Sequence, residues 1–123
     1  MTTPLLDYIA AWAANDAGRV AACVAPDGTV TECYGPVYRG RDRIREWADA
    51  WLGAGGVVHS WKVTDHFAAG DREAAQWVFD CTVGGVRSTI DGATICLNRS
   101  GLVGELREYA TTSPLYEWTG SWR

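Results

Sequence analysis

Residues 57–112 read VVHSWKVTDHFAAGDREAAQWVFDCTVGGVRSTIDGATICLNRSGLVGELREYATT. This stretch is rich in β-branched and aromatic residues, which favour strands, and glycine-containing turn pairs break it at Gly70-Asp71 and Gly84-Gly85. The pattern predicts an antiparallel meander of four long strands, over Val57–Ala68, Arg72–Val83, Val86–Asn98 and Leu102–Thr112. Strongly curved sheets need glycines and bulges, and Gly92 is expected at a bulge.

Helical patterns fill most of the first half. Thr3-Pro4 provides a hydroxyl cap and a proline at the first helical position. Asn15-Asp16 can cap a second, short helix, which Pro26 must end. After a turn, Thr29–Tyr34 is expected as a short strand. Apolar residues at i, i+3, i+4 and i+7 then predict a third helix, through Ile44, Trp47, Ala48 and Trp51.

This order of elements predicts an α+β fold in which a curved sheet wraps the helices and leaves a cavity between them. We expect one domain over residues 1–123, with a core at about 4–112 and a C-terminal tail at 113–123.

Bulk composition excludes several classes of partner. The net charge of −4 disfavours nucleic acid, because binding phosphates needs concentrated positive charge. No apolar run approaches the roughly 20 residues that span a bilayer, and the N-terminus lacks the layout of a secretory signal. A cytoplasmic protein without membrane contact is therefore expected. Its four cysteines have no C-x-x-C spacing and are expected to be free thiols.

Seven tryptophans are more than a small core needs. A large aromatic cavity would use them, and so would a dimer interface. If the cavity exists, it favours a flat, mostly apolar ligand. The candidate ligand-binding residues are Trp12, Cys33, Trp47, Trp51, Trp61 and Trp77.

Three short motifs add a family resemblance. They are Ala25-Pro26-Asp27, Val37-Tyr38-Arg39-Gly40-Arg41-Asp42 and Leu106-Arg107-Glu108-Tyr109. In this order the chain resembles the nuclear transport factor 2-like (cystatin-like) superfamily, in its SnoaL-like branch of polyketide cyclase and ketosteroid isomerase-like domains. The resemblance implies a cone of three N-terminal helices packed in a strongly curved antiparallel sheet around a pocket, and commonly a homodimer.

Compared with ketosteroid isomerases, Tyr8 looks like the tyrosine of the oxyanion hole. Cys33 stands in the position of the general base, and Ala93 lies near the position of the second aspartate. Two of those three working groups are absent, which argues against ordinary steroid isomerisation.

Compared with limonene-type epoxide hydrolases, Asp80 resembles one strand aspartate and Glu108 takes the place of another. Val78 replaces the arginine between them and Cys33 the water-positioning asparagine, which argues against epoxide hydrolysis. Compared with SnoaL-type cyclases, Glu108 matches the late-strand general acid/base.

His59 and His66 are seven residues apart on one strand and so face opposite sides, which argues against a metal site. His59 shares parity with Trp61 and Val63 and is the better candidate to face the pocket. Asp65 shares that face, unless a bulge reverses the assignment.

Two functions stay open. One is a cofactor-free enzyme that isomerises, cyclises or dehydrates a hydrophobic, polyketide- or terpenoid-like substrate. Glu108 would then move the proton, Tyr8 and His59 would stabilise charge on oxygen, and Asp80 would be a second acid. The other is a non-catalytic ligand-binding or dimerisation domain, in which Glu108 and Tyr8 are structural.

Overall fold

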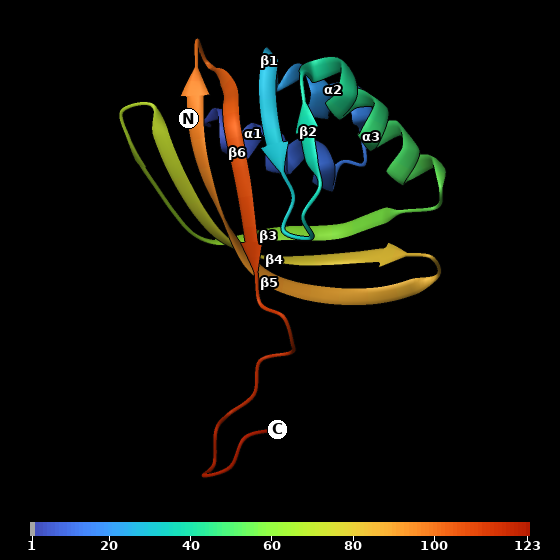
Figure 1. Cartoon of the computed structure of the whole chain (residues 1–123), viewed down its shortest axis with the longest axis vertical. Coiled ribbons are helices and arrows are strands. Elements are labelled where there is room, and N and C mark those ends of the chain that lie inside the picture. The colour runs from blue at the N-terminus through green and yellow to red at the C-terminus, as the bar shows by residue number, and fades with distance from the viewer. Residues whose placement is uncertain (1) are drawn as a thin grey trace.

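The computed structural model describes residues 2–123 and has the expected α+β architecture, with helices against one face of a curved sheet (Figure 1). The helices are α1 (Pro4–Ala13), α2 (Ala17–Ala22) and α3 (Arg41–Gly53). The strands are β1 (Val24–Thr31), β2 (Val37–Arg39), β3 (Val57–Ala69), β4 (Arg72–Val83), β5 (Val86–Arg99) and β6 (Leu102–Ala110).

The first two helices begin where the caps predict. The Leu6 amide donates to Thr3 Oγ1 at 3.3 Å, and the Arg19 amide donates to Asp16 Oδ1 at 3.1 Å. These bonds satisfy amides that have no partner inside their helix. The apolar stripe of α1 is buried, with Leu5 fully enclosed and Trp12 at 5% exposure.

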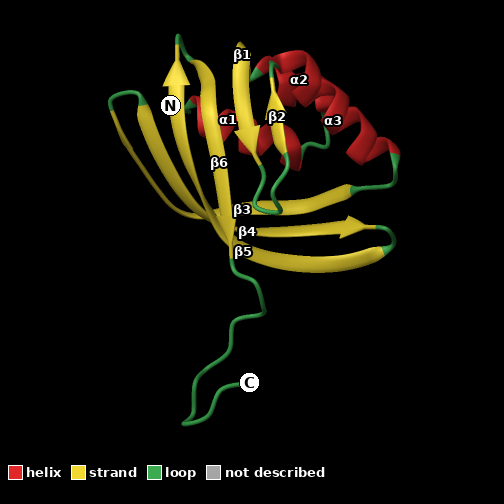
Figure 2. Ribbon diagram, in the orientation of Figure 1, coloured by secondary structure: helices red, strands yellow, loops and turns green. Residues whose placement is uncertain are grey.

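The six strands form one sheet in the order β2-β1-β6-β5-β4-β3. The meander β3–β6 is antiparallel as expected, and its strands turn sharply around the helices (Figure 2). The register shifts at Val58/Ser60 and Val63/Asp65 on β3, and between Val103 and Glu105 on β6 opposite Leu97/Asn98. Extra residues of this kind bend a strand and increase its twist.

One pairing was not anticipated from the sequence. Strand β1 lies parallel to β6, with Thr31 opposite Arg107. Parallel neighbours carry no hairpin signal, because a long stretch of chain separates them. This pairing brings the end of β1 beside the end of β6.

Other expectations need correction. Strand β1 starts at Val24, and its register with β6 shifts between Val24 and Thr29, a segment that contains Pro26, which has no N–H to donate. The segment Val37–Arg39 forms the short strand β2 on the edge of β1, and β6 ends at Ala110, two residues early.

Gly92 also has a different role from the expected bulge. It keeps a regular register, opposite Trp77 on β4 and Ala110 on β6. A Cβ at this position would collide with the Trp77 ring and lie 2.5 Å from the Tyr109 carbonyl oxygen. The glycine therefore makes room for the indole on the inner face.

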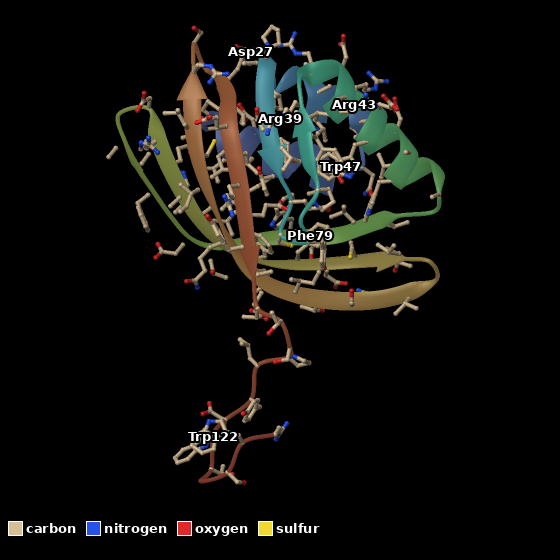
Figure 3. All side chains as sticks on the ribbon, viewed as in Figure 1. Asp27, Arg39, Arg43, Trp47, Phe79 and Trp122 are labelled. Atoms are coloured by element: carbon tan, nitrogen blue, oxygen red, sulfur yellow. The ribbon has the colours of Figure 1, made fainter. Side chains whose placement is uncertain are left out.

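Residues 113–123 run away from the body of the domain, and Trp122 near their end is 80% exposed (Figures 1 and 3). Among residues 2–123, the helices are all too short or too polar to cross a membrane.

Candidate functional site

A cavity of about 600 Å³ lies between the inner face of the sheet and helices α1 and α3. This volume is typical of small-molecule sites, which span about 300–1,000 Å³. Trp47 on α3 and Phe79 on β4 face this space from opposite sides (Figure 3). The lining residues are Trp12, Glu32, Cys33, Tyr34, Tyr38, Trp47, Ala50, Trp51, Trp61, Trp77, Phe79, Cys81, Val83, Ser88, Ile90 and Glu108.

Two groups of packed aromatic rings form the walls. On the helix side, the Trp12 ring lies 5.0 Å from that of Trp47 and 5.6 Å from that of Trp51. On the sheet side, the Trp61 ring lies 5.4 Å from that of Trp77 and 5.0 Å from that of Phe79, both edge-on. Tilted and edge-on contacts of this kind are favourable between aromatic rings, and they hold the rings of each wall against one another.

Glu108 is the acid of the cavity. Along β6, Leu106 and Glu108 face inward while Arg107 and Tyr109 are exposed, as strand alternation requires. Burial, and after it the charge of the nearby Glu32 carboxylate, raise the pKa of Glu108 to about 8, and a hydrogen bond from the Cys33 amide acts against them. Glu108 can therefore both donate and accept a proton near neutral pH.

Glu32 is a second carboxyl in the same cavity, just after β1. The parallel β1–β6 pairing places it beside Glu108. The Tyr38 hydroxyl donates a hydrogen bond to Glu32 Oε1 at 3.0 Å, and the Tyr38 ring stacks on Trp47 at 4.0 Å. Burial raises the pKa of Glu32, whereas the bond from Tyr38 lowers it. The two acids thus have unequal environments.

Cys33, next to Glu32, also lines the cavity. Burial raises the pKa of its thiol to about 11, and the charges of Glu108 and Glu32 act in the same direction. It stays protonated at neutral pH, so it is a poor nucleophile and a poor base there.

Tyr8 is placed differently from the expectation. It is fully buried in the core and does not belong to the cavity lining, so it does not reach a ligand there. Its ring packs edge-on against Trp61 at 6.3 Å, and its hydroxyl has no hydrogen-bond partner among the described residues. The resemblance to ketosteroid isomerases matched Tyr8 by its position on α1, and that position does not determine how deeply the side chain is buried.

His59 and Asp80 are not among the residues that line the cavity, although His59 was expected on the pocket side of its strand. The register shift at Val58/Ser60 breaks the parity between His59 and Trp61, and the exposed His59 contacts Thr82 Oγ1 at 2.7 Å. Asp80 alternates with the inward Phe79 and Cys81, and its carboxylate accepts two bonds from Arg87 at 3.0 and 2.9 Å.

The six candidate ligand-binding residues, by contrast, all line the cavity. Sequence reasoning missed Glu32, Tyr38 and Phe79. Glu32 shares parity with the buried Val30, which was a usable signal. Tyr38 falls between the expected strand Thr29–Tyr34 and the expected third helix, so no periodicity showed which way its side chain points.

Among residues 2–123, no three His, Cys, Asp or Glu side chains are grouped so that they could hold a metal ion. The four cysteines are free thiols, with Cys81 and Cys96 buried.

Comparison with known proteins connects this geometry to a family. A model of the SnoaL-like domain matches residues 5–105. No curated protein matches the sequence significantly.

Solved structures share the fold. A hypothetical protein with a ketosteroid isomerase-like protein fold from Catenulispora acidiphila, in complex with trimethylamine, is 21% identical with a TM-score of 0.77, over 91% of this chain and 89% of that one. An epoxide hydrolase of the LEH-like type from M. tuberculosis is 16% identical with a TM-score of 0.78, over 88% and 80%. A candidate SnoaL-like polyketide cyclase from Mesorhizobium loti is 27% identical with a TM-score of 0.67, over 84% and 92%.

Proposed function

Because the chain belongs to the SnoaL-like domain family, we propose that it is a cofactor-free acid–base enzyme acting on a small hydrophobic molecule in its aromatic cavity. The reaction class is isomerisation, cyclisation or dehydration next to a carbonyl or hydroxyl group. Glu108 is the residue that moves the proton.

One observation carries this proposal: a half-buried carboxyl with a pKa of about 8 lies in a cavity of ligand size. An acid–base catalyst works best when its pKa is close to the working pH. Glu32 contributes by holding the pKa of Glu108 high, and Tyr38 orients Glu32. Strongly shifted acids in clefts are enriched at active sites.

In the proposed reaction, the Glu108 carboxylate removes a proton from a carbon next to a carbonyl, leaving an enolate. The resulting carboxylic acid then returns the proton to a different carbon, or to a leaving hydroxyl. Proton and charge balance without any other reactant. The aromatic walls exclude water from the reacting carbon, which favours return of the proton from Glu108.

The similar structures support a small-molecule ligand. One is in complex with trimethylamine, and another, TerC, was co-crystallised with polyporic acid. The outward position of Asp80 argues against an epoxide hydrolase mechanism built on that acid.

A non-catalytic ligand-binding domain is the second candidate. It is favoured by the replacement of working acids at Cys33 and Ala93 and by the distance of Tyr8 from the cavity lining. Dimerisation fits either candidate, because Ile95 and Tyr109 are half-exposed apolar residues on the outer face of the sheet.

Deuterium exchange separates the two candidates. The probe is 2-tetralone in D₂O, with loss of its C1 protons followed by NMR. We expect the protein to accelerate exchange over buffer, and Glu108→Gln to reduce the acceleration by about 10²–10⁴-fold. The wild-type rate should rise with pH up to about 8, as Glu108 ionises.

The matched control is Glu105→Gln, on the same strand but exposed. This variant should accelerate the exchange of the ketone protons as much as the wild-type protein does. If Glu108→Gln retains the full rate, Glu108 is not the base. If the wild-type protein gives no acceleration but binds the ketone, the binding-domain candidate stands instead.

A further inference from the structure

The residues that line the cavity include aromatic rings and acids but no basic side chain. Eight of the sixteen lining residues are aromatic, two are glutamates, and none is lysine, arginine or histidine. An aromatic ring carries partial negative charge on its faces. Both kinds of lining group therefore favour positive charge in the space between them.

We propose that the ligand of this cavity carries a tertiary or quaternary ammonium group, held between the tryptophan rings and the carboxyls of Glu32 and Glu108. The inference rests on the proposed function, and it adds the substrate class: a hydrophobic amine.

Tryptophan rings line the cavity from both of its walls. A cation is attracted to an aromatic face when it lies within about 6 Å of the ring centroid, and tryptophan gives the strongest attraction. The helix-side group contributes Trp12, Trp47 and Trp51, and the sheet side contributes Trp61 and Trp77. Within each group two rings meet at nearly a right angle, 86° for Trp12 and Trp51 and 90° for Trp61 and Trp77, so the rings that line the cavity do not share one plane.

The groups around Glu108 give it no positive partner. The titratable groups that act on it or feel its charge are Tyr8 from α1, Glu32 and Cys33 after β1, Tyr34, and Tyr38 from β2. All of them are acidic or neutral. Two carboxylates in one cavity repel each other, and an ammonium group would relieve that repulsion.

This charge pattern predicts different affinities for cationic and neutral ligands. An apolar cavity without carboxylates would prefer a neutral molecule, because a cation loses its hydration on entry. A preference for the cation can arise only if the rings and carboxylates more than replace that hydration.

The test compares two probes of the same shape, benzyltrimethylammonium and its neutral carbon analogue neopentylbenzene. Binding is followed through the change in tryptophan fluorescence, because five of the seven tryptophans line the cavity. We expect the cation to bind more tightly, by about tenfold, from cation–π and carboxylate attraction. Because its charge is permanent, its affinity should rise between pH 6.5 and pH 9 as Glu108 ionises, while that of the neutral probe stays constant.

Variants identify the groups responsible. Glu32→Gln should weaken binding of the cation and leave that of neopentylbenzene unchanged, whereas Glu105→Gln should change neither. Equal or tighter binding of the neutral probe by the wild-type protein overturns the inference. So does a cation affinity that Glu32→Gln does not reduce.

These outcomes are separate from the test of the proposed function. If the protein binds the neutral probe more tightly and also accelerates ketone exchange through Glu108, the amine ligand is rejected and the proposed enzyme is supported. If the protein binds the cation more tightly but does not accelerate ketone exchange, it is an amine-binding domain, and the proposed enzymatic function is rejected.

Discussion

Glu73 and Glu108 both lie inside the domain, and their environments are opposite. Glu73 on β4 is 3% exposed and accepts bonds from the Leu5 amide at 3.2 Å and from Asn98 Nδ2 at 2.6 Å. Its other oxygen contacts His66 Nε2 at 2.8 Å. Burial acts to raise the pKa of Glu73, but these bonds and one from Thr3 outweigh it and lower the pKa.

Glu108 has no comparable set of donors. The described residues provide the Cys33 amide as the one hydrogen bond that lowers its pKa, against burial and the charge of Glu32. Burial alone therefore does not identify a working acid. A carboxylate with several donors ties α1 to the sheet, whereas a buried carboxyl with a single donor keeps a proton that it can transfer.

The largest effect should come from breaking the Glu73 network. Glu73→Ala leaves the Leu5 amide, Asn98 and His66 without their acceptor and should destabilise the fold by about 3–5 kcal/mol. Glu73→Gln keeps the volume and should cost about 1–3 kcal/mol. Urea unfolding at pH 7 measures both. A stable Glu73→Ala variant would show that this carboxylate does not hold α1 in place.

The second effect is a difference in pH dependence. The folded-state pKa of Glu108 is raised from 4.5 to about 8, so its stabilising contribution is complete below about pH 4.5 and is lost as pH rises through 8. Glu108→Gln does not titrate. It should therefore gain stability over wild type between pH 5 and pH 9, by more than about 1.4 kcal/mol, the equivalent of one pKa unit.

Glu73 should behave in the opposite way. Its folded-state pKa is lowered, so its contribution is present above its ordinary pKa of 4.5 and is lost as pH falls through the folded value. The cost of Glu73→Gln should shrink in acid. Urea unfolding of the wild type and both variants at pH 3.5, 5, 7 and 9 measures how the free energy of unfolding of each variant, relative to the wild type, changes with pH. Slopes of the same sign would contradict the contrast between the two acids.

A smaller effect is expected from Tyr38→Phe, which removes the bond to Glu32 and keeps the ring stacked on Trp47. The pKa of Glu32 should rise, since it loses a donor. The pKa of Glu108 should then fall, because its neighbour is charged less of the time. Carbon-13 NMR of the two carboxyl groups measures both shifts, and the stability should drop by about 1 kcal/mol. An unchanged titration of Glu108 would show that the two acids are not coupled.

The smallest effect is expected at Asp80. Its partner Arg87 is 63% exposed, so solvent screens the attraction between the two side chains. Asp80→Asn should leave the unfolding midpoint, the deuterium exchange rate and probe binding unchanged. A loss of exchange in this variant would return Asp80 to the mechanism.

The sequence by itself determined the helices, the long strands and the composition of the cavity. Caps such as Thr3 and Asp16, glycine turns and apolar periodicity are local signals, and they mark elements without knowledge of neighbours. The family register also placed Glu108 on the inner face, where the structure has it.

Only the tertiary structure decided which polar groups meet. A bulge beside His59 turned it outward, and alternation around Phe79 did the same for Asp80. The parallel pairing of β1 with β6, between segments about 75 residues apart, brought Glu32 beside Glu108. A single inserted residue reverses every later side chain on a strand, and long-range pairing leaves no mark in either segment. The pKa of Glu108 depends on both, so it belongs to the folded chain and not to any local stretch of it.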